Sequence, residues 1–183
     1  MKKMFAIVLV LSLTALLFTS CETKEGPAKA FSDMSLEEIL SAVYQNGSYS
    51  KNLTALINAP VPDPDSFSFD NYLVTTEINS SNCEYFLGKS DIEFERAIAS
   101  EASMNPTTYS LCLIQAKPEQ DVDALAETIR KNADPMKWVC TGLPEDNVYV
   151  DTAGNIVILV MSATDGEALL SAFRSIASEY SDK

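Results

Sequence analysis

Histidine is absent from the 183 residues, and basic residues are scarce, with 13 Lys and Arg against 26 Asp and Glu. Without imidazole, hydrolases that depend on a Ser–His or Cys–His pair are excluded, and so are zinc sites that use histidine. The chemistry of carboxylates, lysine and tyrosine stays open. Because so acidic a chain repels phosphate backbones, and no stripe of Lys and Arg interrupts it, we expect no nucleic-acid partner.

The N-terminus carries the longest apolar stretch. Lys2 and Lys3 open the chain, and the fifteen residues 4–18 include only Ser12 and Thr14 as polar members. A basic start, an apolar stretch and small residues behind it are typical of a secretory signal peptide. The alternative is a retained membrane span. However, fifteen residues at about 1.5 Å each cover only about 22 Å of the roughly 30 Å hydrocarbon core.

Behind this stretch stands Leu17-Phe18-Thr19-Ser20-Cys21. It resembles the lipobox of bacterial lipoproteins, although Phe18 stands where leucine is usual. The resemblance implies that residues 1–20 are removed and that Cys21 becomes the first residue, carrying two acyl chains such as palmitate. Two chains anchor a protein stably where one gives marginal binding. We therefore expect a protein attached to the cell membrane through lipid on Cys21, on the extracellular face. A chance cysteine near an ordinary cleavage site is the alternative.

Removal of residues 1–20 would leave 11 basic and 26 acidic residues, a net charge of −15. Besides Cys21, three cysteines would remain: Cys83, Cys112 and Cys140. An odd number cannot pair completely. Because Cys112 lies within Leu-Cys-Leu-Ile and Cys140 follows Trp-Val, both are expected to be buried like small hydrophobes, and we expect three unpaired thiols.

The first half of the remaining chain predicts few regular elements. Residues 21–34 lack apolar periodicity and are expected to form a flexible tether. Ser35 and Glu38 have the spacing of a capping box, and apolar residues three and four apart predict a helix over 36–46. The alternate prolines of residues 58–70 exclude a helix and favour an extended, exposed path. Residues 71–78 are rich in strand formers, although they are also compatible with the start of a helix.

The second half is clearer. Residues 94–102 alternate as a half-buried strand would, with a short helix as the alternative, and residues 109–116 form an apolar run of strand length. The apolar spacing within 121–133 predicts a helix capped by Asp121. Residues 148–150 and 156–161 are predicted to be strands joined by a turn at Gly154. A last helix begins at Thr164 or Asp165.

The predicted order of strand, strand, helix, repeated once, indicates an α+β fold. We expect a two-layer domain over residues 35–183, with an antiparallel sheet, helices on one face and an N-terminal helix. The best-defined part is residues 92–181.

Part of the chain, from about Glu95 to Ser162, resembles a known family. The residues that carry the resemblance are Met104-Asn105, the helix at 121–132, Asp134-Pro135-Met136-Lys137-Trp138-Val139-Cys140, and Gly154-Asn155-Ile156-Val157-Ile158-Leu159-Val160-Met161-Ser162. They resemble the lipoproteins of clostridial and related Gram-positive bacteria that contain domain of unknown function 4358. The resemblance implies a lipid-anchored extracellular domain and no particular activity.

Acidic residues suggest several sites. Asp63, Asp65 and Asp70 have oxygen ligands at alternate positions, as calcium requires. An EF-hand loop starting at Asp63 would nevertheless need Gly and Glu where Ser68 and Val74 stand, so we expect a solvated loop and no metal. Residues 61–101 hold nine acids against two basic residues, a net charge of −7, which indicates either a solvated surface or a docking face for a basic partner.

Two further sets of residues have a functional and a structural interpretation. The acid pairs Glu145-Asp146 and Glu93/Glu95 have the residue type that glycoside hydrolysis needs, although adjacency in sequence does not establish the separation across a cleft. The aromatic residues Trp138, Tyr149 and Tyr109 would suit a sugar-binding platform, but a single Trp behind a helix is more often part of the core.

Together these features predict a non-enzymatic binding or accessory domain at the cell envelope, with no catalytic residue, metal or cofactor. Its expected partner is an unknown protein or envelope component. A small-solute binding lipoprotein is the first alternative, disfavoured because 163 residues are few for two lobes around a cleft. A carboxylate-dependent cell-wall hydrolase is the second.

Overall fold

The computed structural model describes residues 30–63, 65, 70–104, 107–139 and 141–181. Its α-helices are α1 (Leu36–Asn46), α2 (Lys51–Asn58), α3 (Cys83–Leu87), α4 (Val122–Asn132) and α5 (Gly166–Ser181). Its strands are β1 (Leu73–Glu77), β2 (Arg96–Ala102), β3 (Tyr109–Gln115), β4 (Val148–Ala153) and β5 (Ile156–Ser162). Two 3₁₀ turns, η1 (Phe31–Asp33) and η2 (Glu145–Asn147), complete the described elements.

The five strands form one sheet in the order β1-β2-β3-β5-β4, and each neighbouring pair is antiparallel. β3 and β5 lie in the middle, with Leu111 opposite Val160 and Leu113 opposite Ile158. Both strands are apolar at nearly every position, and every residue of β5 is buried. The predicted α+β class, the antiparallel sheet and the repeated order of strand, strand and helix are confirmed.

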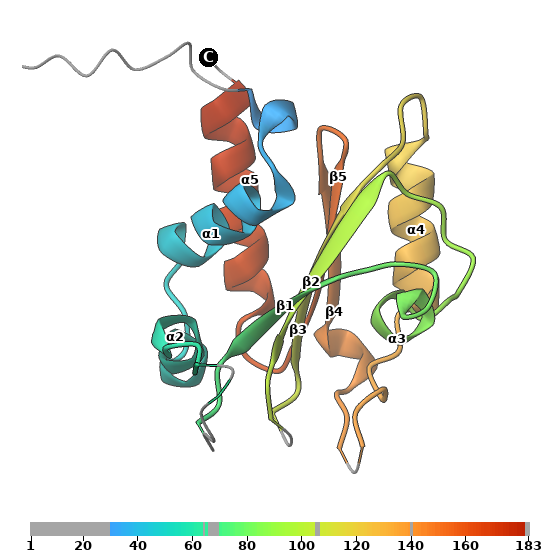
Figure 1. The fold of residues 1–183 in the computed structure, drawn as a ribbon. Coiled ribbons are helices and arrows are strands. Elements are labelled where there is room, and N and C mark those ends of the chain that lie inside the picture. Colours follow the sequence, from blue (N-terminus) through green and yellow to red (C-terminus); the bar gives the residue numbers. More distant parts are fainter. Residues whose placement is uncertain (1–29, 64, 66–69, 105–106, 140, 182–183) are drawn as a thin grey trace, which may run out of the picture.

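The helices cover both faces of the sheet, which corrects the expected two-layer arrangement. Leu111 and Leu113 pack in one core with α1 and α5, whereas Cys112 and Ile114 pack in a second core with α4. Figure 1 shows α1, α2 and α5 on one side of the sheet and α3 and α4 on the other. The reason lies in β3 and β5, because strands that are apolar on both faces need cover on both.

Capping and turn residues predicted where several helices and strands begin or end. Ser35 and Glu38 form the predicted capping box, and Asp121 accepts a hydrogen bond from the Ala124 N–H at the start of α4. Gly154 turns the chain between β4 and β5 with φ of +56°. Residues 71–78 contain strand β1, and residues 94–102 contain strand β2.

The sequence did not predict α2 or α3, which are short. α2 has 8 residues, begins after a Ser50 cap and buries Leu53 and Leu56. α3 has 5 residues and ends at Gly88, where φ is +80°. A Cβ at Gly88 would collide with the backbone carbonyl of Asn132, so glycine is needed for α3 to lie against the end of α4.

The folded domain begins earlier than the expected tether allows. Phe31 is 4% exposed and stacks edge-on against Phe173 of α5, with ring centroids 5.7 Å apart. Met34 belongs to the same core. The C-terminal part of the predicted 21–34 tether is therefore packed structure, because two large apolar side chains are buried there. Cys21 and the predicted signal peptide lie outside the described residues.

Cys83 and Cys112 are unpaired, as predicted, and Cys112 is buried, as predicted. Cys83 is buried as well, and Cys140 lies outside the described residues. Burial raises the pKa of the Cys112 thiol to about 11, so that thiol is an unreactive part of the core. No helix within the described ranges is long and apolar enough to span a membrane.

Candidate functional site

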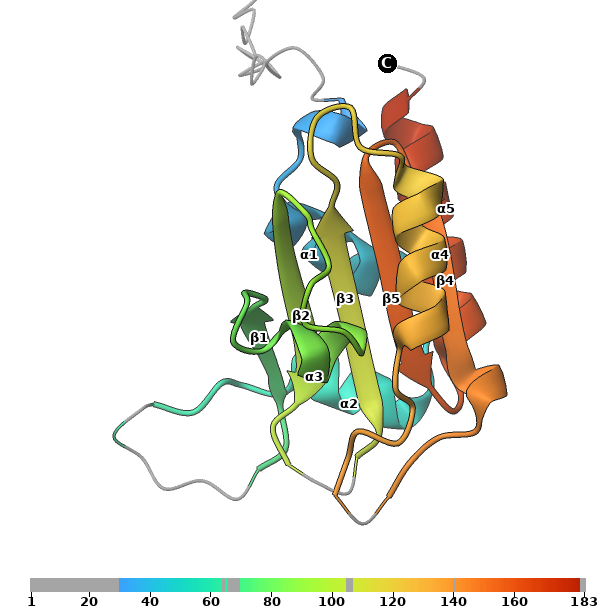
Figure 2. The ribbon, with the colours of Figure 1, turned by 90° about the vertical axis from the view of Figure 1, so that its right-hand side faces the viewer.

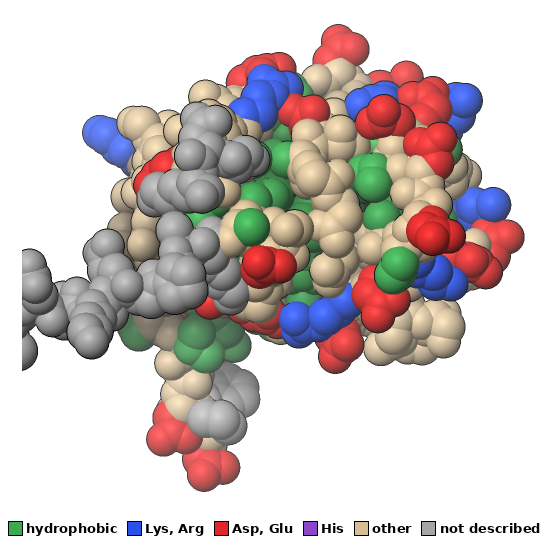
Figure 3. Space-filling view, turned by 90° about the horizontal axis from the view of Figure 1, so that it is seen from above, with side chains coloured by type: hydrophobic (Ala, Val, Ile, Leu, Met, Phe, Trp, Pro, Cys, Tyr) green, Lys and Arg blue, Asp and Glu red, His purple; other side chains and the backbone are tan. Residues whose placement is uncertain are grey.

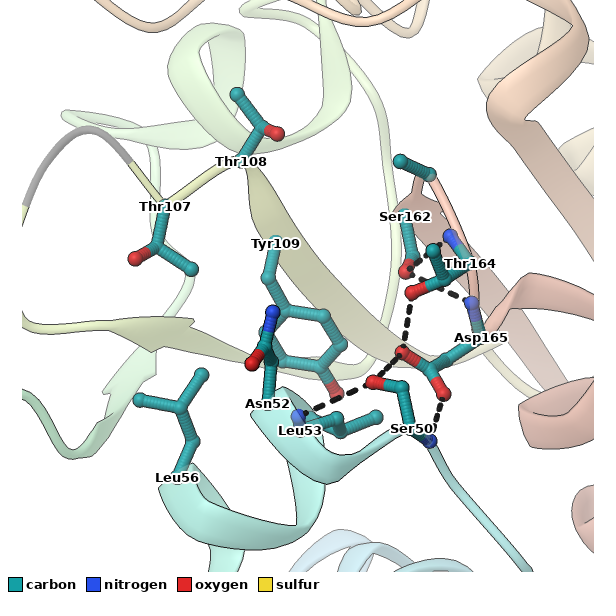
Figure 4. Close-up of a pocket in the computed structure, with 11 residues that line it drawn as sticks. Ser50, Asn52, Leu53, Leu56, Thr107, Thr108, Tyr109, Ser162, Thr164 and Asp165 are labelled. Atoms are coloured by element: carbon teal, nitrogen blue, oxygen red, sulfur yellow. Dashed lines mark hydrogen bonds between the residues drawn. The ribbon is translucent and has the colours of Figure 1, made fainter.

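A pocket of about 320 Å³ opens at one end of the domain, between α2 and the sheet. Its walls come from three segments: residues 50–56 at the start of α2, residues 107–109 at the start of β3, and residues 162–165 between β5 and α5 (Figure 4). Figure 1 shows α2 at the end of the domain opposite η1, where the described chain begins. The pocket therefore lies at the other end of the domain from Ala30, the first described residue.

Asp165 holds the pocket walls together. Its carboxylate accepts hydrogen bonds from the Ser50 N–H (2.6 Å), the Ser50 hydroxyl (2.8 Å) and the Thr164 hydroxyl (2.7 Å). The side chain is buried, 5% exposed, and it lies where the first turns of α2 and α5 meet. A buried carboxylate is stabilised by such donors and by helix N-termini. Asp165 therefore ties two elements that are 115 residues apart in sequence.

A chain of hydroxyl groups lies behind the pocket. Tyr109, which lines it, shares a 2.9 Å hydrogen bond with the Tyr44 hydroxyl, and Tyr44 donates to the Ser100 hydroxyl at 2.8 Å. Burial raises the pKa of Tyr44 to about 12 and that of Tyr109 well above its ordinary value. Both phenols are thus held neutral at physiological pH and are unsuited to act as bases.

The remaining polar groups of the pocket are neutral. They comprise the Asn52 amide and the hydroxyls of Thr107, Thr108, Ser162 and Thr164, next to the apolar side chains of Leu53 and Leu56. Within the part of the chain that the structure describes, no hydrogen bond to the side chain of Asn52 or Thr108 is formed, so both are free for a ligand. Neutral donors and acceptors beside an apolar wall suit a small, uncharged polar molecule.

A second polar cluster lies on the other face of the sheet. Lys137 Nζ is 2.5 Å from Glu101 Oε1 and 3.1 Å from the Ser110 hydroxyl, and it lies over the ring of Tyr85 at 4.5 Å. The side chain of Lys137 is 3% exposed and that of Glu101 is 16% exposed. Tyr85 donates to Glu101 Oε2 at 3.1 Å. This is an ion pair in a largely dry setting, and its geometry fixes the segment after α4 against β2.

Asp63, Asp65 and Asp70, for which a calcium site was weighed against a solvated loop, lie in a loop before β1. Asp63, Asp65 and Asp70 are exposed, and Asp63 accepts a hydrogen bond from the Asp65 N–H at 3.1 Å. Among the described residues no group of three acids or cysteines is arranged to hold a metal ion.

The acids of residues 61–101 are divided among several elements. Glu93 pairs with Lys117 at 3.1 Å, Asp91 with Lys89 at 3.0 Å, and Glu101 with Lys137. On the face seen from above, acidic and basic side chains are interspersed (Figure 3). The segment therefore forms no single acidic surface. The two basic residues of the segment, Lys89 and Arg96, both lie in its C-terminal part.

The predicted acid pairs also lie outside the pocket. Glu93 and Glu95 line two different depressions, and Glu145 and Asp146 are exposed on η2. None of the four lines the pocket beside α2.

The aromatic platform is not formed, which corrects that interpretation. Trp138 is 7% exposed and belongs to the core on the α4 face, as its structural interpretation predicted. Tyr109 and Tyr149 pack on the opposite face of the sheet. The sequence missed Ser50, Asn52 and Thr108 as site residues, because isolated polar residues carry no signal of which segments meet. Asp165 was recognised only as a helix start.

No family model, curated protein or solved structure matches the chain. The resemblance to the family of domain of unknown function 4358 therefore stays a prediction, and the site is interpreted from its geometry alone.

Proposed function

We propose that the chain is a lipid-anchored, non-enzymatic binding domain on the extracellular face of the cell membrane, and that its pocket takes a small, uncharged polar ligand. The anchor is the lipid expected on Cys21. The observation that supports a binding role is the set of neutral groups in the pocket, where the ionisable Asp165 already accepts three hydrogen bonds from the protein. A catalytic site would need a group free to accept or donate a proton.

The position of the pocket supports the same proposal. The described chain begins next to the C-terminal half of α5, and α5 then leads to the pocket at its N-terminus. A helix of 16 residues is about 24 Å long. A domain tethered at the η1 end would therefore present the pocket toward the surroundings and away from the membrane.

Calorimetric titration tests the ligand class. Neutral sugars such as N-acetylglucosamine are expected to bind. The anionic glucose 6-phosphate is expected to bind at least about tenfold more weakly, because no Lys or Arg among the described residues lines the pocket to pair with its phosphate. Thr108→Val keeps the shape of the side chain and removes its hydroxyl, so it should weaken binding. Thr128→Val on α4 is the matched control. Equal binding of neutral and charged sugars, or no binding at all, would contradict the proposed ligand class.

A further inference from the structure

The two edges of the sheet differ in how their backbone groups are satisfied. At the β4 edge, Arg130 donates to the Val150 carbonyl at 2.9 Å and the Asp151 side chain accepts from the Thr152 N–H at 2.8 Å. Side chains therefore occupy outward-facing groups of β4. This is a usual way to prevent another chain from pairing with an edge strand.

The β1 edge is open. In β1 the even-numbered residues bond to β2, since the Ile78 N–H donates to Ala97 and the Ser103 N–H donates to Tyr72. In an antiparallel pair such bonds alternate, so the backbone groups of Leu73, Thr75 and Glu77 face outward. Of these, the Glu77 carbonyl accepts from the Asn82 amide, and Leu73 and Thr75 have no partner among the described residues. Figure 2 shows β1 as the outermost strand.

Apolar side chains are exposed beside this open edge. Val74 is 38% exposed and lies opposite Glu101 of β2, and Tyr85, whose hydroxyl bonds to Glu101, is 43% exposed. Val74 and Tyr85 thus lie on either side of Glu101, and together they offer an added strand an apolar contact beside the edge.

The charge of this region selects the kind of partner. Residues 71–88, which contain β1 and α3, include no Lys or Arg, and their two acids, Glu77 and Glu84, are exposed. The cation nearest to the apolar side chains, Lys137, is buried and paired. A second copy of the chain, with its own net charge of −13, would be repelled, whereas a basic segment would be attracted.

We propose that β1 binds an extended, basic segment of a protein partner, which adds a sixth strand to the sheet. Alternate side chains of that segment would face opposite sides. Apolar ones would contact Val74 and Tyr85 on one face, and Lys or Arg would lie near Glu77 on the other. This protein-binding edge is separate from the proposed ligand pocket, and neither proposal depends on the other.

The probe is a blocked, fluorescein-labelled peptide that alternates Lys and Val over seven residues, measured by fluorescence anisotropy. We expect it to bind, and the matching peptide of alternating Glu and Val to bind at least about tenfold more weakly. Thr75→Pro removes an outward N–H and leaves the bonds to β2 intact, because proline is tolerated at such edge positions. It should weaken binding about tenfold, whereas Thr152→Pro, the same change at the β4 edge, should not.

Hydrogen exchange of the unsubstituted protein, with and without the Lys-Val peptide, is a second test that needs no proline variant. Peptide binding should slow exchange of the Thr75 and Glu77 amides and leave that of Thr152 unchanged. The proposal is overturned if the Lys-Val peptide does not bind, if Thr75→Pro binds it as well as the unsubstituted protein does, or if the acidic peptide binds equally. A concentration-dependent dimer abolished by Thr75→Pro would overturn it in favour of a second copy.

Discussion

The ion pair of Lys137 and Glu101 should contribute strongly to stability because it lies in a nearly dry setting. Lys137→Met keeps an apolar chain over the ring of Tyr85 but leaves the Glu101 carboxylate with only the Tyr85 hydroxyl as a donor. Glu101→Gln leaves the 3% exposed lysine charged without a carboxylate. Removing one partner of a buried pair strands the other charge, which typically costs about 3 to 5 kcal/mol when burial is complete.

The expected magnitudes follow from the difference in burial. Glu101→Gln should lower the free energy of unfolding by about 3 kcal/mol, and Lys137→Met, which leaves a partly solvated carboxylate, by about 2 kcal/mol. The double variant removes both charges and should lose only about 2 kcal/mol in total. The coupling energy is then about 3 kcal/mol.

Urea unfolding followed by far-ultraviolet circular dichroism measures these quantities, and Trp138, the single tryptophan, provides a second probe. The pair Arg130 and Glu127 is the control, since its atoms are 2.8 Å apart but the side chains are 48% and 47% exposed. Its coupling should be about 0.3 to 0.5 kcal/mol and should fall in high salt, while that of Lys137 and Glu101 should persist. Equal, salt-sensitive coupling in the two pairs would refute the reasoning.

Two further predictions concern pH and lipidation. Burial raises the pKa of Tyr44 from 10 to about 12, so the folded state holds the phenol proton more tightly than the unfolded state. The resulting contribution of Tyr44 to the free energy of unfolding is complete below pH 10 and is lost as pH rises to about 12. In urea titrations repeated between pH 10 and about 12, Tyr44→Phe should lose about 2 to 3 kcal/mol less unfolding free energy than the unsubstituted protein. An equal loss in the two proteins would contradict the raised pKa of Tyr44. Cys21→Ala should abolish incorporation of labelled palmitate in cells; continued labelling would show that Cys21 is not the acylated residue.

Features that depend on residues close together in sequence were predicted correctly, and features that depend on distant residues were not. The caps at Ser35 and Asp121, the turn at Gly154 and the stripes of α1, α4 and α5 are local, so the residues that form them lie within one or two turns of each other in sequence. Short elements such as α2 and α3 were missed, because few residues carry too little periodicity and tertiary packing stabilises them.

The candidate sites were predicted least well, and the reason is again physical. The sequence placed the start of the last helix at Thr164 or Asp165, but it did not show that the Asp165 carboxylate bonds to Ser50, 115 residues away. Likewise Glu101 and Lys137 meet only because the segment after α4 folds back onto β2. Pairings of this kind depend on how helices and strands pack against one another. The type and spacing of side chains along the sequence do not reveal that packing.

The sequence alone determined the α+β class, the caps, the order of strands and helices from residue 94 on, and the hairpin at Gly154, because hydrophobic periodicity and turn residues act over short stretches. It also supplied the expectation of a lipid anchor at Cys21, which rests on a local motif. Only the tertiary structure decided that helices cover both faces, that Phe31 belongs to the core, and that β1 is left as an open edge beside apolar side chains. Helices on both faces follow from the burial of both faces of β3 and β5, whereas the place of Phe31 and of β1 depends on contacts between segments far apart in sequence.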